Sequence, residues 1–237
     1  MIKTILFDLD GTLLPMEQET FVKEYFGGLS KKLASLGYGT EKLYPAIWGG
    51  VRGIIKNDTD ARNEDVFWAV FKGFFPDFTE EDKLVFDEYY LNDFDGVAKV
   101  CGHDPRANET VKALKARGYR VALATNPVFP EIATRKRMAW AGLSHGDFEF
   151  YTTYEDHKRC KPNIGYYEEV LARLGADPAE CMMVGNDVDE DMIAEKLGMK
   201  VFLLTDCLLN RNGKDISSYR QGSFAELMEY ISEVGEY

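Results

Sequence analysis

Cysteine and histidine are scarce in this sequence of 237 residues. The four cysteines are widely spaced, at Cys101, Cys160, Cys181 and Cys207. Without a close pair, they match neither the framework of a disulfide-rich fold nor the ligand spacing of a zinc site. The histidines, at His103, His145 and His157, are too few and too far apart for a histidine metal site.

Long apolar runs are also missing. Only Ile5, Leu6 and Phe7 stand together before Asp8, so the N-terminal segment lacks the apolar core of a signal peptide. No stretch approaches the roughly 20 apolar residues of a membrane-spanning helix. We therefore expect a cytoplasmic protein that has no membrane partner and keeps its thiols reduced.

Positively charged residues are also few relative to negatively charged ones. The 28 lysines and arginines face 40 aspartates and glutamates, which gives a net charge of −12. A protein of this charge repels phosphate backbones, so a nucleic-acid partner is not expected. The shares of hydrophobic residues (45%) and charged residues (29%) are ordinary for a globular protein, and the chain is long enough to bury a substantial core.

Patterns typical of strands and helices alternate along most of the chain. Residues 3–7 predict a short strand that stops at Asp8. Further on, the sequence predicts helices at 104–117, 130–141, 164–174, 188–197 and 223–233, and strands at 121–124, 148–152, 181–184 and 201–204. This alternation predicts an α/β fold with a Rossmann-like parallel sheet and helices on both faces.

Residues 16–95 depart from this alternation. They hold 16 of the 31 aromatic residues and no clear strand, and apolar residues recur at helical spacing in four segments. The segments are marked by Phe21, Tyr25, Leu29, Leu33 and Leu36; by Leu43, Ile47, Val51 and Ile54, loosened by Gly49, Gly50 and Gly53; by Val66, Val70 and Phe74; and by Leu84 to Leu91. We predict a core domain of residues 1–15 and 96–237, interrupted by a helical-bundle domain of residues 16–95.

Two carboxylates follow the first predicted strand, in the segment Asp8-Leu9-Asp10-Gly11-Thr12. In a parallel sheet, ligands bind beyond the carboxyl ends of the strands. There, one carboxylate can attack as a nucleophile while the other transfers protons. Taken alone, the pattern is equally typical of a turn that uses Asp and Gly.

Later motifs decide between these two interpretations. The segment from Phe7 to Leu13 resembles the first motif of the haloacid dehalogenase (HAD) superfamily. The family's other motifs follow in order: Thr125 after a strand, Lys161 before a proline, and the acidic segment 183–191. The chain is therefore identified as a member of this superfamily, and its helical insertion resembles the cap of the phosphatase-like subfamily.

The resemblance implies a magnesium-dependent phosphatase that hydrolyses a small phosphorylated metabolite through an aspartyl-phosphate intermediate. Asp8 is the expected nucleophile. Asp10 is the expected proton carrier, because family members that break carbon–halogen bonds lack it. Thr125, Lys161 and the main-chain amide of Asn126 would neutralise the phosphoryl oxygens during in-line attack. Mg²⁺ would lie among Asp8, Asp10 and the fourth motif, since a hard cation relieves the repulsion between carboxylates.

The fourth motif departs from the family pattern, because Gly-Asn-Asp stands at 185–187 where Gly-Asp is usual. Either Asn186 offers its amide oxygen to the metal, or Asp187 takes that role one residue later. On a helix, Asp187 and Asp191 would share one face. That spacing favours Asp187 as the ligand and Asp191 as a partner that orients a metal-bound water or Lys161.

Other functions remain open at this point. A phosphomutase of the same family is one alternative, and a non-catalytic phospho-acceptor or protein-binding relative is another. The substrate has no recognisable motif. Arg52 and Lys56, in or just after the glycine-rich helix of the insertion, are candidate substrate contacts, although solvated surface roles are the commoner use of such residues. We expect a monomer or a homodimer.

Overall fold

A computed structural model describes residues 1–34, 37 and 39–234. Its centre is a parallel sheet in the order β3-β2-β1-β4-β5-β6. The strands are β1 (Thr4–Phe7), β2 (Arg120–Leu123), β3 (Phe150–Tyr151), β4 (Cys181–Gly185), β5 (Lys200–Leu204) and β6 (Gln221–Gly222). The predicted Rossmann-like fold is therefore confirmed, and β1, which carries the Asp8 motif, lies in the interior of the sheet.

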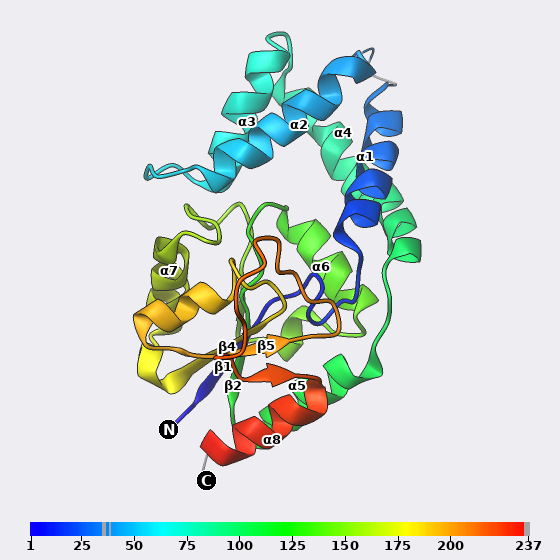
Figure 1. The fold of residues 1–237 in the computed structure, drawn as a ribbon. Coiled ribbons are helices and arrows are strands. Elements are labelled where there is room, and N and C mark those ends of the chain that lie inside the picture. The colour runs from blue at the N-terminus through cyan, green and yellow to red at the C-terminus, as the bar shows by residue number, and fades with distance from the viewer. Residues whose placement is uncertain (35–36, 38, 235–237) are drawn as a thin grey trace.

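Helices cover both faces of the sheet (Figure 1). Side chains alternate along a strand, so neighbouring residues of β1 pack into different cores. Ile5 and Phe7 pack in one cluster with α5 (Pro105–Ala116) and α8 (Phe224–Val234), whereas Leu6 packs in another with α7 (Ile164–Leu174). The remaining helix of the sheet domain, α6 (Glu131–Trp140), lies between the sheet and the helical bundle (Figure 1).

The helix boundaries follow the predicted capping residues. The Asp104 side chain accepts a hydrogen bond from the Arg106 amide at 2.9 Å, and Pro105 opens α5. Gly175 ends α7 in the left-handed conformation, with φ +57°. Local sequence therefore determines where these helices start and stop.

The helix predicted at 188–197 is confirmed only in its second part. Residues 188–191 form turns, and only a 3₁₀ helix, η5 (Met192–Leu197), follows. The Asp187 carboxylate accepts hydrogen bonds from the amides of Asp189 and Glu190, at 2.8 and 3.0 Å. Such side-chain bonds compete with helical hydrogen bonding, so the chain turns here instead. The short strand β6 was not predicted, and β3 is shorter than the predicted strand at 148–152.

The segment between β1 and α5 forms a helical bundle that contributes no strand to the sheet among its described residues. It consists of α1 (Gln18–Ala34), α2 (Thr40–Ile55), α3 (Asn63–Phe74), α4 (Glu80–Glu88), the π-helix η1 (Tyr89–Asp93) and the 3₁₀ helix η2 (Phe94–Val100). Phe21, Tyr25, Leu29 and Leu33 are buried along α1 as the pattern predicted. Leu36, predicted on the same helix, lies outside the described residues.

Aromatic side chains fill the core of the bundle. Phe71 lies in edge contact with Trp68, Phe78 and Phe86 at centroid distances of 4.9–5.6 Å. The glycines of α2 do not break that helix. A Cβ at Gly50 would lie 2.5 Å from the Phe67 ring, so the glycine lets α2 and α3 approach closely.

No described helix combines the length and the apolar character that a membrane crossing requires.

One buried histidine predicts a pH dependence of folding stability. His157 is fully buried, its Nδ1 lies 3.1 Å from the Thr153 carbonyl oxygen, and its Nε2 has no hydrogen-bond partner. Burial lowers the pKa of His157 from 6.5 to about 4. As the pH falls from about 6.5 to about 4, His157 is protonated in the unfolded chain but stays neutral in the folded chain. This difference lowers the free energy of unfolding by about 3 kcal/mol.

This pH dependence is expected to disappear in part when the histidine is replaced. Denaturant unfolding across that pH range should show a shallower fall in the free energy of unfolding for His157→Phe than for the unmodified protein. The exposed His145 offers the matched control, because His145→Asn should leave the slope unchanged. Equal slopes for His157→Phe and the unmodified protein would contradict the assignment.

Candidate active site

The predicted catalytic residues come together at the carboxyl ends of three neighbouring strands. Asp8 follows β1, Thr125 follows β2, and Asn186 and Asp187 follow β4. Each strand delivers its residues to one edge of the sheet because all three run parallel. The helical bundle faces this edge (Figure 1).

Lys161 joins two of these carboxylates from within the protein. Its side chain is 1% exposed, and its Nζ lies 2.9 Å from Asp8 Oδ1 and 2.6 Å from Asp191 Oδ1. Burial alone would lower the pKa of Lys161, but the Asp191 and Asp8 carboxylates outweigh it and hold the pKa well above its usual value. A permanent positive charge therefore lies beside Asp8.

Thr12 holds the other oxygen of Asp8. Its hydroxyl lies 3.3 Å from Asp8 Oδ2 and 2.9 Å from Asn186 Oδ1, so one hydroxyl bridges the first and fourth motifs. The Asp8 amide donates to the Val184 carbonyl oxygen at 2.9 Å, which ties the start of the motif to β4. These contacts orient the Asp8 carboxylate, although the sequence analysis gave Thr12 no separate role.

Asp10 is paired with a residue that the sequence analysis missed. Arg137 of α6 is fully buried, and its Nη1 forms an ion pair with Asp10 Oδ2. The same guanidinium group lies 4.4 Å from the centroid of the Phe129 ring. Burial raises the pKa of Asp10, and Arg137 opposes that rise. The second oxygen, Oδ1, is buried without a hydrogen-bond partner and is free to meet a reacting group.

A signal for Arg137 was present in the sequence. Ala133 and Arg137 of α6 and Ala141, which follows it directly, recur every four residues, so they lie on one side of this segment. An arginine on an otherwise apolar, buried face requires an anionic partner. The sequence alone predicts that Arg137 lies on a buried face. It does not predict which anion pairs with it, because Asp10 lies 127 positions away.

Asn126 ties two loops of the site together. Its side-chain Oδ1 accepts a hydrogen bond from the Lys161 amide at 3.2 Å, and its Nδ2 donates to Glu190 Oε2 at 3.0 Å. The side chain of Thr125 is buried, and Tyr166 donates to its carbonyl oxygen at 2.8 Å. The loops that carry Thr125 and Lys161 are therefore held in a fixed relation.

Glu190 lies within the acidic segment of the fourth motif, but no role was predicted for it. Burial raises the pKa of Glu190 to about 8, and the Asp187 carboxylate adds to that rise. The glutamate lines the same cavity as Asp8 and Asp10. Glu190 thus joins Asp8 and Asp10 among the carboxyl groups that line this cavity.

The two candidate metal ligands of the fourth motif have different surroundings. Asn186 is 1% exposed, donates to the Cys207 carbonyl oxygen at 2.7 Å and shares Thr12 with Asp8. Asp187 has both oxygens engaged, Oδ1 by two main-chain amides and Oδ2 by Arg211.

Asp191 and Asp189 also differ. Asp191 accepts from the Asp187 amide at 2.9 Å through Oδ2 and contacts Lys161 through Oδ1. A Cβ at Gly185 would collide with the Asp191 carboxylate, so glycine is required where the chain leaves β4. Asp189 pairs with Lys214 at the surface.

The described residues include no group of three or more His, Cys, Asp or Glu side chains arranged to hold a metal ion. The Thr12 hydroxyl instead brings together two oxygens of different type, the Asp8 carboxylate and the Asn186 amide oxygen. Oxygen donors of this kind suit a hard cation such as Mg²⁺. The unpartnered Oδ1 of Asp10 lies in the same motif.

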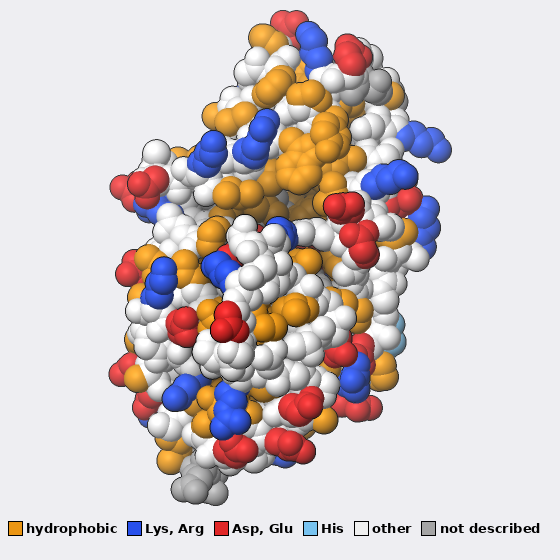
Figure 2. Space-filling view, viewed as in Figure 1, with side chains coloured by type: hydrophobic (Ala, Val, Ile, Leu, Met, Phe, Trp, Pro, Cys, Tyr) orange, Lys and Arg blue, Asp and Glu red, His pale blue; other side chains and the backbone are white. Residues whose placement is uncertain are grey.

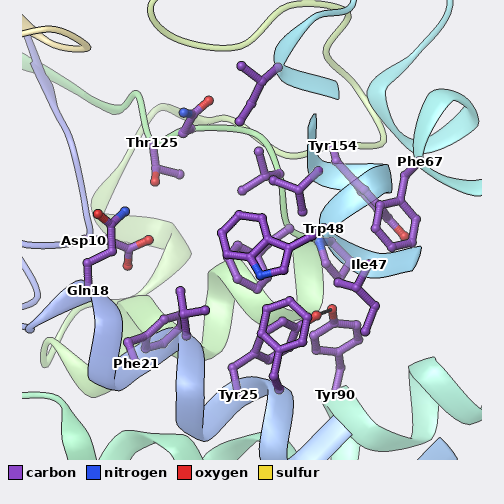
Figure 3. Close-up of a pocket in the computed structure, with 18 of the residues that line it drawn as sticks. Asp10, Gln18, Phe21, Tyr25, Ile47, Trp48, Phe67, Tyr90, Thr125 and Tyr154 are labelled. Carbon is purple, nitrogen blue, oxygen red and sulfur yellow. Dashed lines mark hydrogen bonds between the residues drawn. The ribbon is translucent and has the colours of Figure 1, made fainter. Parts of the chain in front are cut away.

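A cavity of about 200 Å³, called here the bundle cavity, lies between the helical bundle and this edge of the sheet. Asp8, Asp10 and Thr125 line its base, and Phe21 and Trp48 are among the residues that line its bundle side. Figure 3 shows Asp10 and Thr125 beside the aromatic side chains of the bundle. Arg52 and Lys56, the predicted substrate contacts, are exposed and are not among its lining residues.

Comparisons with known proteins agree with this geometry. A family model described as haloacid dehalogenase-like hydrolase matches residues 2–197. The glyceraldehyde 3-phosphate phosphatase of Methanothermobacter thermautotrophicus is 31% identical over 121 residues, which cover 48% of this chain and 52% of that protein. The phosphoglycolate phosphatase of Aquifex aeolicus is 28% identical over 236 residues, with 96% of this chain and 97% of that protein covered.

The fold recurs among solved structures as well. The structure of 2-haloacid dehalogenase from Pseudomonas syringae pv. Tomato DC3000 aligns with a TM-score of 0.66 and 21% identity. The alignment covers 99% of this chain and 100% of that one. At this identity the likeness concerns the fold alone.

Proposed function

We propose that this chain, which belongs to the haloacid dehalogenase-like hydrolases, is a cytoplasmic, magnesium-dependent phosphatase of a small phosphorylated metabolite. The observation that carries the proposal is the Asp8 carboxylate at the base of the bundle cavity. Lys161 and Thr12 hold its two oxygens in place. The similarity to a phosphoglycolate phosphatase over nearly the whole chain supports the same reaction class.

In the proposed reaction, an Asp8 oxygen attacks the phosphorus atom and the bond to the ester oxygen breaks. Asp10 gives its proton to that oxygen, so a neutral alcohol leaves. Asp10 then takes a proton from water, whose oxygen attacks the aspartyl phosphate and releases inorganic phosphate and the Asp8 carboxylate. Lys161, the Thr125 hydroxyl and the Asn126 amide would stabilise the phosphoryl oxygens.

Arg137 influences both the orientation and the protonation of Asp10. Its ion pair with Oδ2 holds the carboxyl group in one orientation and leaves Oδ1 without a partner. Burial favours the protonated form of Asp10 and Arg137 favours the ionised form. Opposing influences of this kind suit a group that must act first as an acid and then as a base.

We further propose that residues 16–95 act as a cap over the site. The bundle lines the cavity opposite Asp8, and a cap that closes would exclude bulk water from the phosphoryl group.

Magnesium would be held by Asp8, by Asp10 and by the fourth motif. When bound, it supplies positive charge to the phosphoryl oxygens. In the fourth motif, the contacts favour Asn186, because its Oδ1 contacts the same Thr12 hydroxyl as Asp8, whereas the Asp187 carboxylate pairs with Arg211 and with main-chain amides of its own turn. Asp187 would then shape the turn rather than bind the metal.

Magnesium titration tests this proposal. Chelation should abolish hydrolysis of p-nitrophenyl phosphate, and added Mg²⁺ should restore it. The Mg²⁺ concentration for half-maximal rate should rise about tenfold or more for Asn186→Ala. It should rise less for Asp187→Ala, and not at all for the surface control Asp189→Ala. A larger rise for Asp187→Ala would assign the ligand to Asp187, and activity that persists in a chelator would refute the metal dependence.

A further inference from the structure

We infer that the bundle cavity selects phosphate monoesters of uncharged, apolar alcohols about as large as one aromatic ring. The inference rests on the proposed phosphatase function and assigns its substrate class. Three features of the cavity support the inference: the charge of its lining, its size, and one hydrogen-bond donor that has no partner.

The cavity has an apolar wall and an acidic base. The wall consists mainly of aromatic and aliphatic side chains such as Phe21, Ile47, Trp48 and Phe67, which gather around the space in Figure 3. Figure 2 shows apolar side chains massed on the bundle beside the hollow that separates it from the sheet domain.

The charged residues that line the cavity are Asp8, Asp10 and Glu190, and no Lys or Arg from the described part of the chain lines it. A leaving group with its own carboxylate or phosphate would therefore enter an apolar space in which no side chain offers it a counter-ion. The lost hydration disfavours such a ligand. An uncharged apolar group instead gains by leaving water.

Size limits the group further. An apolar protein cavity of about 150 Å³ admits benzene, and the bundle cavity measures about 200 Å³. One ring with a short link to the phosphate therefore fits, whereas a nucleoside with its sugar and base would be too large and too polar.

Trp48 adds a polar requirement. Its Nε1 is buried and has no hydrogen-bond partner, and Figure 3 shows the indole within the cavity. Tyr25 and Tyr90, by contrast, bond each other through their hydroxyl groups at 2.6 Å. A buried donor without a partner costs free energy that a ligand acceptor recovers. The preferred substrate thus carries one ether, carbonyl or hydroxyl oxygen on its apolar body.

An adjoining groove is lined in part by two cations, Lys23 and Arg211. Arg211 is already paired with Asp187 and donates to Gln18 Oε1 at 2.7 Å. This leaves Lys23 as the group to which an anionic tail would have to extend. A higher kcat/KM for anionic substrates than for uncharged apolar ones would therefore contradict the inference.

A comparison of substrates with similar leaving groups tests the inference on the full chain with Mg²⁺. We expect kcat/KM to be about tenfold higher for benzyl phosphate than for ethyl phosphate, and lowest for phosphoglycolate. A methoxybenzyl phosphate should exceed benzyl phosphate. Phosphoglycolate at or above benzyl phosphate would overturn the inference while leaving the phosphatase function intact.

Ligand binding separates this inference from the proposed function. If no monoester is hydrolysed, the phosphatase proposal fails. The substrate class then depends on whether benzyl phosphate raises the melting temperature more than phosphoglycolate does. Equal or reversed shifts would overturn the inference.

Two cavity variants sharpen the test. Trp48→Phe should lower kcat/KM for the methoxybenzyl ester about tenfold while affecting the benzyl ester much less. The matched control is Trp140→Phe, whose indole donates to Asp95 at 2.9 Å outside the cavity and should not alter the ratio. Val51→Lys places a cation in the wall and should shift preference toward phosphoglycolate. Unchanged preferences in both cavity variants, with folding verified by circular dichroism, would refute the assignment.

Discussion

Replacement of Asp8 by asparagine should lower the phosphatase rate about 10³-fold or more while the protein stays folded. An amide cannot form the acyl phosphate on which the proposed reaction depends. Asparagine has nearly the same shape and keeps an oxygen that can accept from Lys161 or Thr12, both of which now contact Asp8. The loss should therefore appear in kcat, measured with p-nitrophenyl phosphate and saturating Mg²⁺.

The control for this experiment lies in the fourth motif. Asp189→Asn changes a carboxylate that pairs with Lys214 at the surface and should leave kcat unchanged. Circular dichroism and the melting temperature would verify that Asp8→Asn is folded. If Asp8→Asn kept more than a few per cent of the rate, a nucleophile other than Asp8 would have to be sought.

Replacement of Lys161 by methionine should damage both activity and stability. The substitution removes the charge beside Asp8, so the phosphoryl group loses a fixed cation. It also leaves Asp8 and Asp191 buried without their partner. Removing one partner of a buried ion pair costs about 3–5 kcal/mol, because the remaining charge is uncompensated. Denaturant unfolding should show this loss, together with a fall of several hundredfold or more in kcat, of about the order found for a lost oxyanion-hole donor.

A double variant separates the two effects. Lys161→Met combined with Asp191→Asn removes one orphaned carboxylate, so part of the stability should return while activity stays low. The surface variant Lys214→Met, which breaks only the exposed pair with Asp189, should change neither stability nor kcat measurably. If the double variant were no more stable than the single one, the ion pair between Lys161 and Asp191 would not be the source of the loss.

Most of the scaffold was predictable because its signals are local. The Asp104–Pro105 cap and the Gly175 stop act within one helical turn, so their effect can be recognised from neighbouring residues. Apolar runs such as 4–7 and 181–184 predict buried strands in the same way. Placement of the motif residues at one edge of the sheet then follows from parallel topology.

The helix predicted at 188–197 shows where local patterns fail. Its apolar spacing is helical, but the Asp187 side chain bonds the next amides, and Asp191 turns back to Lys161 and to the Asp187 amide. The turn is stabilised by partners that include a residue 30 positions away. Periodicity carries no information about such contacts.

By itself, the sequence determined the sheet with its inserted helices and the order of the motifs that bring Asp8, Thr125 and Lys161 together. Only the tertiary structure decided that Arg137 pairs with Asp10, that Thr12 bridges to Asn186, and that Trp48 is left with an unused donor in an apolar cavity. The reason is physical. Secondary structure and strand ends depend on residues a few positions apart. The charge and size of a cavity depend on which side chains, far apart in the chain, the packed elements leave facing one another.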